Sequence, residues 1–260
     1  MDTHEAVKRH HCLVEEKGYE VVMTVLVGSQ NYELDVESSD VDTFSFVMPS
    51  FEDLALAREP VSGEFEVEDG KCMYKDMRLA LNLLKKTSPN SVECFVSYYQ
   101  YHNPKYEMVL YKYLSNENGY LNKMVHCNHS HMLYACAGMA HQLTKRNMPA
   151  GKRYSHALRL LSMVDVFTTS LDSRSLLTLL PRDYEEAKYA KRNNEAFLEH
   201  YYNSGCEYVA QKLDKVREEY TNSSFMEHVE LEGQKLVKEF QQELFKLYLK
   251  DMLSEESKWN

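Results

Sequence analysis

The chain has 260 residues, of which 43% are hydrophobic and 27% charged, so it can bury a substantial core as one large domain or two small ones. The formal net charge of −10 argues against a protein that coats nucleic acid nonspecifically, because such binding needs a broad surface of Lys and Arg. The six cysteines form no CxxC pair, the N-terminus has no basic start followed by an apolar run, and no stretch approaches the roughly 20 apolar residues of a membrane span. These features predict free thiols, a cytoplasmic location and no membrane partner.

The first hundred residues predict a small sheet with helices. Residues 4–17 have a helical spacing of apolar side chains, and the run YEVVMTVLVG (19–28) predicts a strand covered on both faces. VDTFSFVMP (41–49) predicts a second strand, which Pro49 ends. GEFEVEDGKCMYKD (63–76) predicts a hairpin in which Asp69-Gly70 forms the turn. Helices are expected in MRLALNLLKK (77–86) and, after a break at Ser88-Pro89, in SVECFVSYY (91–99).

The remainder of the chain predicts helices only. Segments 119–146, 153–169, 183–218 and 227–254 have apolar residues at helical spacing, and no convincing strand follows Asn103-Pro104. We therefore expect an α+β protein in which a small mixed sheet (residues 1–103) is followed by an all-helical domain (residues 104–260).

Two aspartates stand one residue apart where the second strand begins. Alternation along a strand places Asp40 and Asp42 on one face, about 7 Å apart, where their like charges repel unless a cation lies between them. Hard divalent cations prefer such oxygen ligands and often bridge to phosphates. Upstream, Gly28-Ser29 ends a strand where a helix is expected, and its glycine, hydroxyl and free N–H groups suit an anion.

Gly28-Ser29, a tyrosine and a leucine soon after, Ser39-Asp40-Val41-Asp42 and Pro49 together resemble the nucleotidyltransferase superfamily of DNA polymerase beta. More narrowly, the chain resembles the predicted nucleotidyltransferases of the RNA-repair-pathway branch, which are common in bacteria and phages. SPNSVECF (88–95) and GKRYSHALRLL (151–161) are also similar to that branch, so the resemblance covers roughly residues 20–165.

The resemblance implies a reaction as well as a fold. A nucleoside monophosphate would pass from an NTP to a hydroxyl acceptor with Mg²⁺ (or Mn²⁺), and pyrophosphate would leave. Asp40 and Asp42 would ligate the metals of a two-metal site, and Gly28 and Ser29 would hold the triphosphate. Glu33 departs from the pattern, since relatives commonly have glycine there, and its carboxylate either weakens nucleotide binding or points to solvent.

The family also needs a third carboxylate on a neighbouring strand, as a metal ligand or as the base that activates the acceptor hydroxyl. Asp76 ranks first, because relatives carry an acidic residue at the matching place. Glu66 and Glu68, which share one face of the first hairpin strand, remain alternatives.

One basic segment stands out in this acidic chain, HQLTKRNMPAGKRYSHALR (141–159). Lys152, His156 and Arg159 share one helical face by their spacing, and the family resemblance favours a role for them in nucleotide binding. The alternative is an ordinary solvated loop and helix start.

The acceptor stays open at this stage. By analogy with the RNA-repair branch it is an RNA 3′ end, which suggests repair or tailing of RNA such as tRNA. The alternatives are a protein side chain, as in the AMPylating enzymes of toxin–antitoxin or phage–host systems, and a non-catalytic nucleotide-binding protein. A phage-encoded chain would act in the host cytoplasm.

Overall fold

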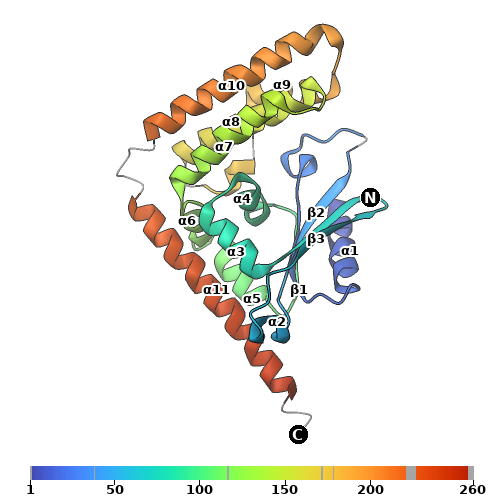
Figure 1. Ribbon diagram of the computed structural model, residues 1–260, viewed down its shortest axis with the longest axis vertical. Helices are drawn as coiled ribbons and strands as arrows, with labels where there is room; N and C mark the ends of the chain where they lie inside the picture. Colours follow the sequence, from blue (N-terminus) through green and yellow to red (C-terminus); the bar gives the residue numbers. More distant parts are fainter. Residues whose placement is uncertain are drawn as a thin grey trace.

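The fold is of mixed α+β class, built on a five-stranded sheet (Figure 1). The computed structural model describes residues 2–37, 39–115, 117–170, 172–177, 179–220 and 227–256. The strand order is β3-β4-β2-β1-β5; β2 and β4 are parallel, and the other neighbouring pairs are antiparallel. The strands are β1 (Val21–Leu26), β2 (Val41–Val47), β3 (Ser62–Val67), β4 (Gly70–Asp76) and β5 (Gln100–His102).

The predicted strands are confirmed, with two differences in detail. All six residues of β1 are buried, as expected for a strand covered on both faces. In the hairpin, Val67 pairs with Gly70, so Glu68 and Asp69 form the turn and Gly70 begins β4. A Cβ on Gly70 would lie 2.2 Å from the Val41 carbonyl oxygen, so glycine here permits the close approach of β2. The short edge strand β5 was not predicted, because three residues are too few to show alternation.

Helices cover both faces of the sheet and form the rest of the molecule. Helix α1 packs on one face and α3 and α4 on the other, while α7 to α10 pack together beyond the end of β1 and β2 that carries the aspartates (Figure 1). The predicted segment 119–146 is two helices, and 183–218 is also interrupted. The helices are α1 (Thr3–Glu15), α2 (Phe51–Ala55), α3 (Met77–Lys86), α4 (Pro89–Val96), α5 (Glu107–Leu114), α6 (Tyr120–Val125), α7 (His129–Lys145), α8 (Ala150–Thr169), α9 (Pro181–Arg192), α10 (Glu199–Tyr220) and α11 (Glu227–Glu256), with short 3₁₀ turns η1 (Ser29–Tyr32), η2 (Arg174–Leu177) and η3 (Ala196–Leu198).

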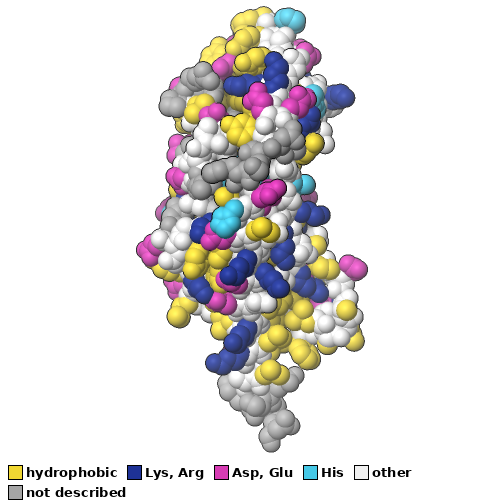
Figure 2. Space-filling model, turned by 90° about the vertical axis from the view of Figure 1, so that its left-hand side faces the viewer, with side chains coloured by type: hydrophobic (Ala, Val, Ile, Leu, Met, Phe, Trp, Pro, Cys, Tyr) yellow, Lys and Arg dark blue, Asp and Glu magenta, His cyan; other side chains and the backbone are white. Residues whose placement is uncertain are grey.

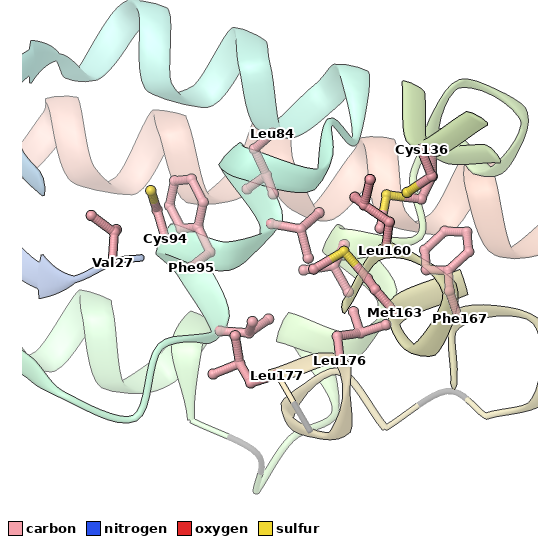
Figure 3. Packing of buried hydrophobic residues seen from close by; sticks show 14 of the residues in the cluster. Val27, Leu84, Cys94, Phe95, Cys136, Leu160, Met163, Phe167, Leu176 and Leu177 are labelled. Carbon is pink, nitrogen blue, oxygen red and sulfur yellow. The ribbon is translucent and has the colours of Figure 1, made fainter. Parts of the chain in front are cut away.

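One continuous cluster of buried side chains joins the sheet to the helices (Figure 3). Val27 at the end of β1 and Phe95 of α4 belong to it, together with Cys136 of α7, Met163 of α8 and Leu177 of η2. Burial of this apolar surface therefore stabilises both predicted halves together. The boundary between residues 103 and 104 stays a prediction.

Helix α11 returns along the molecule and ties distant segments together (Figure 1). Its Glu243 pairs with Lys112 at 2.6 Å, and its Tyr248 hydroxyl donates to the Pro49 carbonyl at 2.6 Å. Figure 2 shows this side of the molecule, where Lys and Arg side chains gather in the lower half among acidic and hydrophobic ones. All six cysteines are free, as predicted, and none of the described helices is long and apolar enough for a membrane span.

Candidate active site

The turn after β1 lies directly against the second aspartate. Gly28 has φ +76°, a conformation that favours glycine, and a Cβ placed on it would lie 3.6 Å from Asp42 Oδ2. The Val27 amide also donates to the Asp42 carbonyl at 2.9 Å. Ser29 then begins η1, and its hydroxyl has no hydrogen-bond partner among the described residues. The structure thus brings together Gly28, Ser29 and Asp42, as the sequence predicted.

Asp40 and Asp42 lie at the head of β2, where the first is exposed and the second half-buried. Burial raises the pKa of Asp42, and the charges of Asp40 and Glu66 raise it further, while Lys71 acts in the opposite direction. The Gln30 side-chain amide donates to the carbonyl of Asp40 at 3.3 Å and so helps to hold the backbone at Asp40 in place. The negative charge of Asp40 disfavours the ionised form of Asp42, and one divalent cation bound by both carboxylates would relieve this repulsion.

The neighbouring strand places a cation beside these carboxylates. Lys71 of β4 is the register partner of Asp42, so the two side chains share a face of the sheet. The Lys71 ammonium lies 3.1 Å from Glu64 Oε1 and 3.3 Å from Glu66 Oε1. Both glutamates belong to β3, which is one strand further from Asp42. Glu68, the other alternative, lies exposed in the β3–β4 turn.

The assignment of Asp76 as the third carboxylate is wrong. Asp76 pairs in register with Val47, five residues from Asp42, which is about 16 Å along the strand and on the opposite face of the sheet. It is fully buried and is the N-cap of α3, where it accepts from the Arg78 amide at 2.8 Å and pairs with the Arg78 guanidinium at 2.6 Å. An aspartate just before a helix is a common cap, and this one is fully occupied by that role.

Behind the glycine turn lies a buried ion pair. The Gly28 amide donates to Glu93 Oε1 at 2.7 Å, and Arg159 Nη1 lies 3.6 Å from Glu93 Oε2; the two side chains are only 7% and 11% exposed. Burial raises the pKa of Glu93, while Arg159 and the Gly28 amide favour its ionised form. The Arg159 guanidinium also lies 4.4 Å from the centre of the Tyr32 ring.

This pair changes two of the predicted roles. Because the Gly28 N–H already has an acceptor, it is not available to a phosphate. Arg159 supports the loop from behind, so the prediction that it binds the nucleotide directly is not met in this arrangement. The three stretches that carry the family resemblance supply Gly28, Glu93 and Arg159, and they meet at this point.

The other basic residues gather over the outer part of the same loop. Lys191 of α9 donates from Nζ to the Leu34 carbonyl at 2.8 Å and lies 3.4 Å from Ser39 Oγ. Burial lowers the pKa of His156 to about 3, with further lowering by the charges of Arg159, Lys152, Lys191 and Arg146. Burial also lowers the pKa of Lys191, as does Lys152. A surface with this many cations favours a bound anion.

The Glu33 side chain points to solvent, which is one of the two alternatives that the sequence left open. Glu33 adopts the left-handed conformation (φ 55°, ψ 24°) that favours glycine, and its side chain is exposed to solvent. Its carbonyl accepts from the Tyr184 hydroxyl at 3.1 Å. On this side of η1 lies a pocket of about 660 Å³, whose lining includes Glu33, Tyr98, Leu177 and Tyr184.

Asp40 and Asp42 supply carboxylate oxygens of the kind that a divalent cation prefers. In the part of the chain that the structure describes, no three His, Cys, Asp or Glu side chains are grouped so as to hold a metal ion. Asp40 and Asp42 would be the protein ligands of a single Mg²⁺ or Mn²⁺, and the nucleotide's phosphates would complete its shell.

No protein-family model matches the chain, and no curated protein does so either.

The sequence reasoning missed three residues of this region. Glu93 had a readable signal, since a carboxylate within the apolar run SVECFV needs a buried partner. Lys71 follows from the hairpin only once its register with β2 is known. Lys191 had no local signal, because its position depends on how α9 packs against the loop.

Proposed function

We propose that this protein is a metal-dependent nucleotidyltransferase of the polymerase beta type, which moves a nucleoside monophosphate from an NTP to a hydroxyl acceptor. The observation that carries the proposal is the contact between the Gly28 turn and the Asp42 carboxylate, with cations of α8 and α9 over the same loop. The Ser29 hydroxyl, a pair of carboxylates and a cationic surface are the groups that a nucleotide's phosphates and their metal ion require.

In this proposal, separate residues bind the triphosphate, hold the metal and accept the proton. The Ser29 hydroxyl, Lys191 and Lys152 bind the triphosphate, and His156 lies near the two lysines as a neutral imidazole. Asp40 and Asp42 hold the metal, which would neutralise phosphate charge when bound. Glu66 takes the role first predicted for Asp76, since its charge reaches Asp42 from the same face of the sheet.

The proposed reaction is an in-line displacement. The acceptor hydroxyl oxygen bonds to the α-phosphorus, and the bond from that phosphorus to the bridging oxygen of the β-phosphate breaks. Pyrophosphate leaves with the bonding electron pair, and the hydroxyl proton passes to Glu66. Lys71, held between Glu64 and Glu66, fixes the position of the Glu66 carboxylate.

We propose an RNA 3′-hydroxyl as the acceptor. The pocket of about 660 Å³ beside η1 combines Tyr98 and Tyr184 with the polar Glu33, and aromatic side chains with polar neighbours suit an unstacked terminal nucleotide. A protein hydroxyl is the alternative that the experiment must separate.

The position of Lys71 favours a second candidate, a nucleotide-binding protein without transfer activity. A lysine stands on the neighbouring strand directly beside Asp42, where a third carboxylate would complete a two-metal site. Such a protein would bind NTP with Mg²⁺ and release it unchanged.

The test is transfer of label from each of the four α-labelled NTPs, with Mg²⁺, to total RNA or to co-purifying protein. We expect labelled RNA, loss of labelling in the double variant Asp40→Asn/Asp42→Asn, and loss in Glu66→Gln. Glu64→Gln is the matched control, since it removes the other partner of Lys71 and should keep activity. Binding of NTP without transfer to any acceptor would establish the second candidate instead.

A further inference from the structure

A second pocket lies on the same face of the sheet as the candidate active site. Side chains alternate along β2, so Asp42, Phe44 and Phe46 point to one face, and Phe44 follows Asp42 by about 7 Å. Beyond Asp42 lies a pocket of about 270 Å³ that Phe44, Phe46 and Lys75 line from the sheet and that Asn90, Ser91 and Cys94 line from α4. The same helix carries Glu93, which holds the Gly28 turn.

The pocket combines an aromatic wall with a lysine that has no carboxylate partner among the described residues. The Lys75 ammonium lies 5.4 Å from the centre of the Phe44 ring. Among the described residues it has no carboxylate within ion-pair distance, in a chain of net charge −10. The exposed side-chain amide of Asn90 likewise has no hydrogen-bond partner among them. An aromatic face and two free polar groups are what a flat heterocycle with hydrogen-bonding edges requires.

We infer that this pocket binds the base of the NTP and selects guanine and uracil, which carry a carbonyl oxygen at C6 of the purine ring and at C4 of the pyrimidine ring. The inference rests on the proposed function. A lysine ammonium only donates hydrogen bonds. Guanine O6 and the corresponding pyrimidine O4 are acceptors, whereas adenine and cytosine carry amino donors at these positions. Lys75 therefore favours the first pair of bases and disfavours the second.

The dimensions agree with a base alone. Pockets that hold a whole drug-sized ligand have volumes of about 300–1,000 Å³, so 270 Å³ suits the base, with the ribose and phosphates outside it. Phe44 lies two positions along β2 from Asp42, with one residue between them, and one ribose separates a base from its α-phosphate. The base would stack on Phe44 while the α-phosphate lies at Asp42.

The test compares the affinity of the protein for GTP, UTP, ATP and CTP in the presence of Mg²⁺ by isothermal titration calorimetry. We expect GTP and UTP to bind about tenfold more tightly than ATP and CTP, and Lys75→Met to remove this difference. Lys86→Met is the matched control, because it removes one exposed positive charge from the adjoining helix α3 and should change nothing. Phe44→Leu should weaken all four about tenfold through lost stacking.

A second arm separates this inference from the proposed function. In Asp42→Asn, the four nucleoside monophosphates should keep the same order of affinity, and Lys75→Met in that background should abolish it. An Mg²⁺-independent affinity for NTP would count against the proposed function and leave the base preference readable. Equal affinity for the four bases, a preference that survives Lys75→Met, or no binding of any nucleotide would overturn the inference.

Discussion

Breaking the buried pair behind the glycine turn should cost far more than breaking an exposed one. In Glu93→Gln, the Arg159 guanidinium would remain almost fully buried without a carboxylate, since the two side chains are 7% and 11% exposed. Removal of one partner of a buried pair costs about 3–5 kcal/mol, a large part of the 5–15 kcal/mol by which most domains are stable. For a chain of this size, about 3 kcal/mol corresponds to a fall of roughly 10 °C in Tm.

Urea denaturation of a double-mutant cycle measures this quantity. Arg159→Met should destabilise about as much as Glu93→Gln, whereas Glu93→Gln/Arg159→Met should lose much less than the sum, because no unpaired charge remains. The control is Glu232→Gln, which breaks the well-exposed Lys123–Glu232 pair and should change stability little. Single variants that lose less than about 1 kcal/mol, or losses that simply add, would refute the reasoning.

Three further predictions concern the candidate site. Burial and neighbouring carboxylates raise the pKa of Asp42, so its charge is unfavourable in the folded protein. Asp42→Asn should therefore have a Tm at pH 7 no lower than that of the parent, but it should lose Mg²⁺-dependent NTP binding. A lower Tm or intact binding would count against this electrostatic explanation. The pKa of His156 is lowered from 6.5 to about 3, so below pH 6.5 the unfolded chain binds a proton at His156 that the folded chain does not bind. The free energy of unfolding should therefore fall as the pH is lowered from about 6.5, by at most about 1.4 kcal/mol per pH unit. Urea titrations between pH 7 and 5 should show a shallower fall in His156→Gln and no change of slope in the exposed-site variant His200→Gln. Glu33→Gly should stabilise by about 1 kcal/mol because it relieves a left-handed backbone, whereas Glu37→Gly, at an exposed residue without positive φ, should give no gain in the same assay.

Local sequence patterns determined the elements of the fold and the centre of the site. Each predicted strand forms in its apolar or alternating run, because a strand buries either both faces or every second residue. The proximity of Gly28 to Asp42 was also foreseeable, since the turn after β1 and the start of β2 belong to adjacent antiparallel strands. These are short-range consequences of the chain's own order.

The third carboxylate was decided by tertiary structure. Asp76 and Glu66 belong to one hairpin, and the family resemblance ranked Asp76 first, although an aspartate before a helix suits both a cap and a ligand. The register of the parallel pair β2 and β4 places Asp76 on the face of the sheet opposite Asp42 and places Lys71 beside Asp42. A shift of one residue in that register would reverse both outcomes, since side chains alternate faces along a strand.

The surroundings of the loop were likewise decided by long-range packing. Lys191 reaches Leu34 only because α9 lies against a loop more than 150 residues earlier in the chain. Arg159 shares a helical face with Lys152, yet α8 turns it inward to Glu93 while Lys152 stays exposed. The spacing of residues along a helix predicts which of them share a face, but only the packing of that helix determines which of them are buried.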